Sequence, residues 1–210
     1  MRSRTGGWLS FPRADRPGTP RSNGASEADE SVEALAGALV PPTPPQAERL
    51  FGPATVAAEH YARLLAGPAV ARGLIGPHEV PRLWERHLLN SAAVAELVPR
   101  PCSLVDLGSG AGLPGIVLAL LLPDVAVTLL EPMLRRVRFL EECVADLGLA
   151  NAQVCRGRAE DLAGQLAADV VTARAVAPLD RLGVRSVDVV RAGDGKVDPA
   201  TTVVRLTAGP

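Results

Sequence analysis

The sequence has few aromatic residues, no paired cysteines and no long uninterrupted apolar run, and each shortage excludes a class of protein. Aromatic residues are 3% of the 210 residues, which argues against a protein that binds single-stranded nucleic acid through stacked rings. Cys102, Cys143 and Cys155 lie far apart, a spacing typical of reduced thiols and of neither a zinc site nor a disulfide set. The longest apolar stretch, residues 113–130, is interrupted by a Pro-Asp pair, so we expect no membrane span and a cytoplasmic protein.

A strong net charge is also lacking. Lys and Arg number 22 and Asp and Glu number 23, which gives a formal net charge of −1. No global basic field attracts nucleic acid, so a nucleic-acid partner would have to meet a local patch. The N-terminus is basic but lacks the apolar segment of a secretory signal peptide.

Composition divides the chain into four segments. Residues 1–45 are rich in Pro, Gly, Ser and charged residues, and we expect a disordered tail. Residues 46–100 carry apolar residues at helical spacing, with Gly67-Pro68 as the expected end of the first helical region. Residues 101–182 alternate short apolar runs with longer periodic segments, and residues 183–210 look like a pair of strands.

The segment 101–182 has the rhythm of a doubly wound, mostly parallel sheet. Short apolar runs predict buried strands, and the longer segments between them predict helices. Strands that alternate with helices in this way are typical of an α/β fold. The predicted strands are residues 103–107, 125–130, 152–155 and 169–172, and the predicted helices are residues 113–122 and 134–147.

A glycine-rich turn follows the first predicted strand and opens the first predicted helix. Glycines there let the chain turn sharply and let a ligand approach bare backbone. One interpretation uses Gly110, Gly112 and Gly115, whose G-x-G-x-x-G spacing is typical of dinucleotide binding. The other interpretation uses Gly108, Gly110 and Gly112 together with a carboxylate just before them.

Two carboxylates bear on this choice. Asp106 lies two residues before the first glycine, where it would attract a cationic amino group and repel a pyrophosphate. It therefore favours S-adenosylmethionine over a dinucleotide. Glu131 ends the second predicted strand and can accept both ribose hydroxyls of either cofactor. An ordinary tight turn is the competing interpretation, but strand, turn, helix and spaced acid together favour ligand binding.

Loops after the third and fourth predicted strands would reach the same carboxyl edge of the sheet. Ala159 and Glu160 follow the third strand and could frame an adenine ring, although a carboxylate at a helix start explains Glu160 equally well. Arg174 ends the fourth strand, where it would face cofactor and substrate or, alternatively, cap a helix or pair with Glu131.

Residues outside the sheet complete the predicted site. His87 and Asn90 lie three residues apart on one helical face and can project together toward the cofactor. The alternative for His87 is that it packs against Trp84 and bonds a backbone carbonyl. Arg86, Arg135 and Arg136 are candidate contacts for RNA phosphates, and a solvated Arg-rich surface is the alternative.

Five motifs in order, spread over residues 46–182, resemble one family. They are LWERHLLNS (83–91), VDLGSGAGLPG (105–115), LEPMLRR (130–136), RGRAE (156–160) and ARAVA (173–177). On these motifs the chain resembles the RsmG (GidB) family of bacterial methyltransferases of small-subunit ribosomal RNA. Within that family it resembles the actinobacterial branch most. The resemblance implies a Rossmann-like class I methyltransferase fold with N-terminal helices, S-adenosylmethionine as cofactor, and methyl transfer to N7 of one guanine of 16S rRNA.

The resemblance also implies site residues and partners. N7 of guanine has a lone pair and no proton, so attack on the sulfonium methyl group needs no general base and depends on positioning. Arg174, His87 and Asn90 are the candidates for that positioning. We expect a monomer that acts on 16S rRNA or the small ribosomal subunit without a metal. The family's cofactor positions fall on Gly108, Leu113, Glu131, Ala159, Glu160 and Arg174.

The chain departs from the family pattern after Leu182. The family continues with a helix, a central fifth strand and another helix before the last hairpin, but only 28 residues follow here. We expect an internal deletion that removes the fifth strand and leaves the fourth strand with an unpaired edge or a new neighbour. Two alternatives therefore stay open: a methyltransferase of a small molecule or protein, and a shortened paralogue that binds cofactor or rRNA without turnover.

Overall fold

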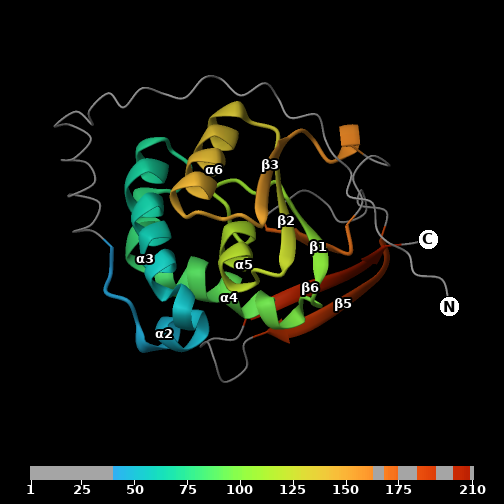
Figure 1. Cartoon of the computed structure of the whole chain (residues 1–210), viewed down its shortest axis with the longest axis horizontal. Coiled ribbons are helices and arrows are strands. Elements are labelled where there is room, and N and C mark those ends of the chain that lie inside the picture. Colours follow the sequence, from blue (N-terminus) through green and yellow to red (C-terminus); the bar gives the residue numbers. More distant parts are fainter. Residues whose placement is uncertain (1–39, 163–167, 175–183, 193–200, 209–210) are drawn as a thin grey trace.

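The computed structural model describes residues 40–162, 168–174, 184–192 and 201–208, the last two ranges by their backbone alone. In the described residues a parallel sheet is covered by helices (Figure 1). This is the α/β architecture that the sequence predicts. No described helix has the length and apolar content needed to cross a membrane. The expected tail falls on residues 1–39, which lie outside the described residues, and on residues 40–45.

The N-terminal part of the described chain is a series of short helical segments. It contains two π-helical segments, η2 and η4, of which η2 continues α3 directly. The bounds are α2 Pro45–Phe51, η1 Gly52–Ala54, α3 Thr55–Leu64, η2 Leu65–Ala69, η3 Pro77–Arg82, η4 Leu83–Leu89, α4 Asn90–Ala93 and η5 Val94–Leu97.

Two expectations for this part were wrong. Gly67-Pro68 does not end the helix, because the chain widens into the π-turn η2 with Pro68 inside it. A wider turn accommodates proline, which lacks the N–H of a regular helix. The segment just before α2 is also packed: Trp84 Nε1 donates to Pro41 O at 3.0 Å, and Thr43 Oγ1 donates to Glu59 Oε1 at 2.6 Å. These contacts tie the end of the expected tail to the helical segments.

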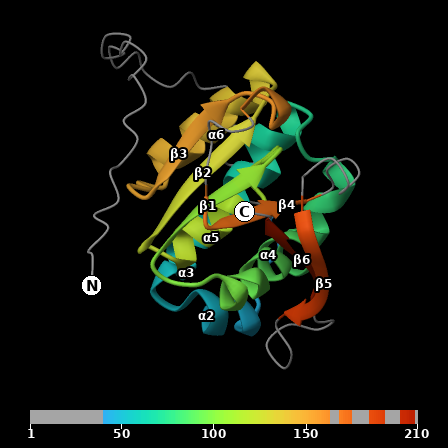
Figure 2. The same cartoon turned by 90° about the vertical axis from the view of Figure 1, so that its right-hand side faces the viewer.

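The main sheet has four parallel strands in the order β3-β2-β1-β4. The chain therefore moves outward from β1 through β2 to β3 and then returns to the other side of β1. Figure 2 shows the twist of this sheet. The bounds are β1 Cys102–Leu107, α5 Gly115–Leu121, β2 Val125–Glu131, α6 Leu134–Asp146, β3 Ala152–Arg156, η6 Glu160–Leu162 and β4 Val170–Ala173.

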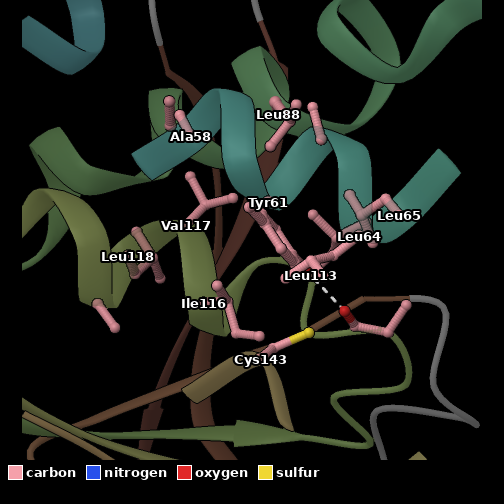
Figure 3. Close-up of a cluster of buried hydrophobic side chains, with 14 of the residues drawn as sticks. Ala58, Tyr61, Leu64, Leu65, Leu88, Leu113, Ile116, Val117, Leu118 and Cys143 are labelled. Carbon is pink, nitrogen blue, oxygen red and sulfur yellow. Dashed lines mark hydrogen bonds between the residues drawn. The ribbon is translucent and has the colours of Figure 1, made fainter. Parts of the chain in front are cut away.

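One hydrophobic core lies between the sheet and the helices. Alternate residues of β1 and β2, including Leu104, Val127 and Leu129, are at most 1% exposed and belong to the same cluster as the apolar side of α5. The N-terminal helices pack on α5 from outside, with Tyr61 of α3 directed toward Leu113 beside Ile116 (Figure 3). The loops at the carboxyl edge of the sheet therefore start from strands that are packed in this core.

The C-terminal strands form a second, separate sheet. β5 (Val184–Ala192) and β6 (Thr201–Ala208) pair antiparallel, as the sequence predicts for two final strands. Within the described ranges, β4 is hydrogen-bonded to β1 alone and therefore forms an edge of the four-stranded sheet. The junction at which we expect the deletion lies in residues 175–183, outside the described part of the chain.

Candidate functional site

The carboxyl ends of the four parallel strands meet at one edge of the sheet, and the predicted site residues follow these ends. β1 runs into Gly108, β2 ends at Glu131, and β4 runs into Arg174. β1 is also where the strand order reverses, because β2 lies on one side of it and β4 on the other. In open α/β sheets, ligands bind in the crevice outside such a reversal. This places the candidate site between the glycine loop and Arg174.

The glycine loop is held in a tight conformation by the backbone and by close packing. Gly108, Gly110 and Gly112 have φ values of 65°, 61° and 98°, in the left-handed region that glycine adopts without strain. A Cβ on Gly112 would lie 2.8 Å from the Tyr61 hydroxyl, and one on Gly115 would lie 2.7 Å from Asp106 Oδ2. Glycine is therefore favoured by conformation at 108 and 110, by space at 115, and by both at 112.

Tyr61 of α3 holds the glycine loop through a hydrogen bond. Its side chain is fully buried, and its hydroxyl donates to Ala111 O at 2.7 Å across a separation of 50 residues. Burial raises the pKa of Tyr61 well above its ordinary value, so the hydroxyl remains a donor at every physiological pH. The helical spacing of the N-terminal segment predicts that Tyr61 is apolar core. It does not reveal this contact with the loop.

Asp106 lies beneath the loop and not at its surface. The residue is 0% exposed; its Oδ2 accepts from Gly115 N–H at 3.1 Å and its Oδ1 accepts from Thr172 Oγ1–H at 3.0 Å. Burial raises the pKa of Asp106 to about 6, and these hydrogen bonds offset only part of that effect. Its oxygens bind α5 and β4, and the expectation that it attracts a cofactor's ammonium group, directly or through water, stays a prediction.

Glu131 connects the end of β2 to the glycine loop. Its Oε2 accepts from Gly110 N–H and its Oε1 accepts from Met133 N–H, each at 3.0 Å, and only 1% of the residue is exposed. Arg136 Nη1 lies 3.7 Å from Oε2 and covers the carboxylate from α6. A ligand that bonds Glu131 would use the remaining lone pairs of these oxygens and would displace part of this cover.

Ala159 and Glu160 lie at the same edge, after β3. Ala159 is half-buried, and its carbonyl accepts from Leu162 N–H at 3.3 Å, while Glu160 begins η6 and is exposed. The preceding Gly157 N–H donates to Glu131 O at 3.3 Å, which holds this turn beside the end of β2. The structure therefore brings the turn and Glu131 together at one edge.

Arg174 meets the helical segment η4 on the opposite side of the loop. Its Nη2 lies 2.8 Å from His87 Nδ1 and donates to Arg86 O at 3.3 Å, and Asn90 Nδ2 donates to the same carbonyl at 3.2 Å. Arg174, at the end of β4, is thus a neighbour of His87 and Asn90, which lie together on the helical segments. Arg174 does not pair with Glu131, the alternative that the sequence allowed. Its Nη1 is buried and has no hydrogen-bond partner among the described residues.

His87 has a second partner that the sequence analysis missed. Glu79 Oε2 lies 2.8 Å from His87 Nε2, and the Nε and Nη1 of Arg86 each lie 3.5 Å from this carboxylate. Burial lowers the pKa of His87, and the hydrogen bond from His87 lowers the pKa of Glu79. A lone glutamate eight residues before a histidine carries no recognisable spacing, so no sequence signal points to it.

The arginines predicted to contact RNA lie at two places. Arg135 is exposed at the start of α6, and Arg136 is the residue that covers Glu131. Arg86 is half exposed on η4 beside Glu79. The structure therefore puts Arg136 at the Glu131 end of the edge and Arg86 at the Arg174 end. It does not gather all three into one cluster of contacts.

Comparisons with known proteins point to one family. Residues 55–195 match the family described as "GidB: rRNA small subunit methyltransferase G". A protein of Thermobifida fusca (strain YX) named "Ribosomal RNA small subunit methyltransferase G" is 53% identical over 197 aligned residues, 77% of this chain and 83% of that protein. Proteins of the same name from Streptomyces avermitilis and Mycolicibacterium smegmatis are 47% and 55% identical over 82% and 73% of this chain, and 88% and 66% of their own lengths.

The alignment lengths also show that this chain lacks residues that two of its relatives have. The Thermobifida fusca alignment has 197 positions, but 77% of this 210-residue chain is about 162 residues, so about 35 positions are occupied in the relative alone. The Streptomyces avermitilis alignment has 209 positions for about 172 residues of this chain, a gap of about 37. Gaps of this size are long enough for the internal deletion that the family pattern predicts, which stays a prediction. A strand and a helix fit within such a length.

Proposed function

Because the chain belongs to the family of rRNA small subunit methyltransferase G, we propose that it transfers a methyl group from S-adenosylmethionine to N7 of a guanine in 16S ribosomal RNA. One observation carries the proposal: the glycine loop, Glu131 and Arg174 converge on the carboxyl edge where the strand order reverses. The substrate follows from the names of the relatives and from the family resemblance.

The residues at this edge fit the proposed cofactor. S-adenosylmethionine supplies a methyl group on a positively charged sulfur, flanked by a nucleoside and an amino acid. Glu131 would bind the ribose, because it lies between the glycine loop and α6 with a carboxylate at the strand end. Ala159 and Glu160 would bind the adenine. Arg174 would bind a carboxylate or carbonyl oxygen, because its buried Nη1 has an unused donor.

The glycine loop would form the floor of the cofactor site. Gly108, Gly110, Gly112 and Leu113 bring backbone close to the site, and Leu113 is itself packed in the core. Asp106 would contribute indirectly, by fixing the start of α5 and the adjacent β4. A cofactor bound here would rest on elements that the hydrophobic core already holds in place.

The proposed reaction requires orientation from the protein and no acid–base step. Guanine N7 presents a lone pair in the plane of the ring and loses no proton when it is methylated. The chain's contribution would be to align N7 with the methyl carbon and the sulfur, and to exclude water. Arg174 at the end of β4, held by His87, would orient the guanine or the cofactor from one side, with Asn90 beside them.

Contact with RNA would depend on local arginines, since the net charge of the chain is −1. Arg86, Arg135 and Arg136 lie at the two ends of the edge and would each neutralise a phosphate. Every neutralised phosphate releases counterions, so binding through these residues weakens as salt rises. We therefore expect the affinity for RNA, and not the affinity for the cofactor, to fall steeply with ionic strength.

A methyl-transfer assay with isotopically labelled S-adenosylmethionine tests the function. The acceptor is the small ribosomal subunit from cells that lack the corresponding methylation, and nucleosides from the digested rRNA are separated by mass spectrometry. The expected product is N7-methylguanosine. Deproteinised 16S rRNA, a mixture of small metabolites and a mixture of proteins are the comparison acceptors.

Two outcomes would contradict the proposal. Label in metabolites or protein, and none in rRNA, would indicate a methyltransferase of another substrate class. Binding of S-adenosylhomocysteine without any transfer would indicate a shortened relative that binds its cofactor without turnover. The gap of about 35 positions makes this alternative important to test. A 16S fragment made with 7-deazaguanosine lacks the acceptor nitrogen and supplies the matched control.

A further inference from the structure

We propose that Glu79 and His87 are positioning residues, which together hold the guanidinium group of Arg174 with one N–H edge turned toward an oxygen of the bound ligand. The inference deepens the proposed function and rests on it in one respect, namely that Arg174 belongs to the ligand site. It assigns a role to Glu79, which neither the sequence motifs nor the family's cofactor positions include. The three side chains come from η3, η4 and the end of β4.

The chain of contacts fixes the protonation state of the histidine. Arg174 Nη2 lies 2.8 Å from His87 Nδ1, and a guanidinium nitrogen can only donate. Nδ1 must therefore present its lone pair, and the ring proton is on Nε2. That proton is donated to Glu79 Oε2 at 2.8 Å. A carboxylate that fixes the tautomer and orientation of a histidine in this way determines what its other nitrogen can hold.

The same contacts use Nη2 of Arg174 and leave Nη1 for a ligand oxygen. Nη2 is shared between His87 Nδ1 and Arg86 O, while Nη1 is buried without a partner among the described residues. A buried N–H group of a charged side chain is costly when it lacks an acceptor. The oxygen it needs is a carboxylate or carbonyl oxygen, which either the methyl donor or the guanine can supply.

Electrostatics are consistent with this arrangement. His87 is faced by Glu79 from η3, by Arg86 on its own segment and by Arg174 from β4, and Arg82 also lies near Glu79. Burial lowers the pKa of His87, which favours the neutral ring that the contact with Arg174 requires. Protonation at low pH would remove that acceptor and place a second positive charge beside the guanidinium.

The test compares Glu79→Ala, Glu79→Gln and His87→Asn with the wild type, and Glu85→Ala, an exposed position on η4, is the control. Glu79→Ala should lower kcat/KM by about tenfold or more, because a guanidinium group held loosely loses its alignment. Glu79→Gln should recover much of this loss, since its amide oxygen still accepts from Nε2–H. In both variants the acid limb of the pH profile should move to lower pH, because the carboxylate that favours protonated His87 is gone.

His87→Asn should abolish the acid limb that His87 produces and keep part of the activity, since an amide oxygen can accept from Arg174 but does not titrate in this range. A merely structural contact would lower activity in Glu79→Ala without moving the pH profile. That result, with no rescue by Glu79→Gln, would overturn the proposal. Far-UV circular dichroism and thermal melting show whether each variant is folded.

Two further readouts separate this proposal from the proposed function. Long-range ¹⁵N NMR of the imidazole should show a proton on Nε2 and none on Nδ1 of His87, and this measurement requires no methyl transfer. The opposite tautomer would overturn the proposal even in an active enzyme. Calorimetry with S-adenosylhomocysteine identifies the source of the oxygen: weaker binding in Glu79→Ala assigns it to the methyl donor. An unchanged Kd with a raised KM for RNA assigns it to the guanine, and no change in either quantity contradicts the role.

Discussion

The strands on the two sides of β1 differ in how well they are packed. On one side, β2 and β3 lie against α5 and α6, and Val127 of β2 is 1% exposed. On the other side, β4 has four residues and Val171 is 48% exposed. The first side carries Glu131, and the second carries Arg174. The half of the site that would bind the nucleoside therefore rests on a well-packed core. The half that would orient the substrate rests on an edge strand.

Asp106 joins the two halves, and this explains its burial. Its carboxylate accepts one hydrogen bond from Gly115 at the start of α5 and another from Thr172 of β4. Loss of either neighbour would leave a buried carboxylate short of a donor, which costs free energy. The two halves of the site thus differ in how well they are packed. The hydrogen bonds of Asp106 hold the weakly packed β4 to the start of α5, so β4 keeps its place beside the glycine loop.

Gly115→Ala should have the largest effect, and it lies on the packed side. The new methyl group would overlap Leu129 Cδ2 and lie 2.7 Å from Asp106 Oδ2. We expect a loss of about 3 kcal/mol in the free energy of unfolding, measured by urea titration. The control is Gly76→Ala, where a Cβ meets nothing within 4 Å. Equal stability of the two variants would contradict the packing described for this side.

Asp106→Asn tests the junction between the halves through pH. Burial raises the pKa of Asp106 from 3.8 to about 6, so the folded protein takes up a proton at this carboxyl before the unfolded chain does. The wild type should therefore gain stability relative to the variant as pH falls from 7 to 4, by on the order of 3 kcal/mol. Unfolding titrations at several pH values measure the difference. Parallel profiles would mean that Asp106 is not buried as described.

A matched pair of substitutions compares the two sides directly. Val127→Ala in β2 removes methyl groups from the core and should cost about 2 kcal/mol. Val171→Ala in β4 removes them from a side chain that is half exposed and should cost about 0.5 kcal/mol. Chemical unfolding of both variants gives the comparison. Similar losses would show that β4 is covered as well as β2 is.

Tyr61→Phe should have a smaller effect on stability than Val127→Ala and a specific effect on the loop. The variant keeps the buried ring but leaves Ala111 O without its donor, which should cost about 1 kcal/mol. Because Ala111 lies within the glycine loop, we also expect weaker binding of S-adenosylhomocysteine, measured by calorimetry. Unchanged affinity would indicate that the loop keeps its conformation without this hydrogen bond.

Much of the fold could be predicted from the sequence because its signals are local. Short apolar runs marked β1 to β4 to within a residue or two, and the glycine turn placed the start of α5 close to Gly115. The π-turn through Pro68 could not be predicted in this way. Proline usually ends a helix, and only packing of the surrounding core keeps this one continuous.

The site was predictable as a list of residues and not as a set of contacts. Glycine spacing and strand-end carboxylates identified the loop and Glu131, whose position at the end of β2 follows from chain order. The bonds from Asp106 to α5 and β4 could not be predicted, because a sequence does not show which strand residues turn inward at an edge. Contacts such as Tyr61 with Ala111 and Glu79 with His87 depend on how separate elements pack, and nothing local encodes them.

The most direct measurement is a calorimetric titration of S-adenosylhomocysteine into the purified chain, into Glu131→Ala and into Glu141→Ala, an exposed control on α6. The geometry predicts one binding site in the wild type and the control, with affinity reduced about tenfold or more in Glu131→Ala, since each tenfold is about 1.4 kcal/mol. No heat of binding in the folded wild type, or equal affinity in all three proteins, would contradict a cofactor site at this edge of the sheet.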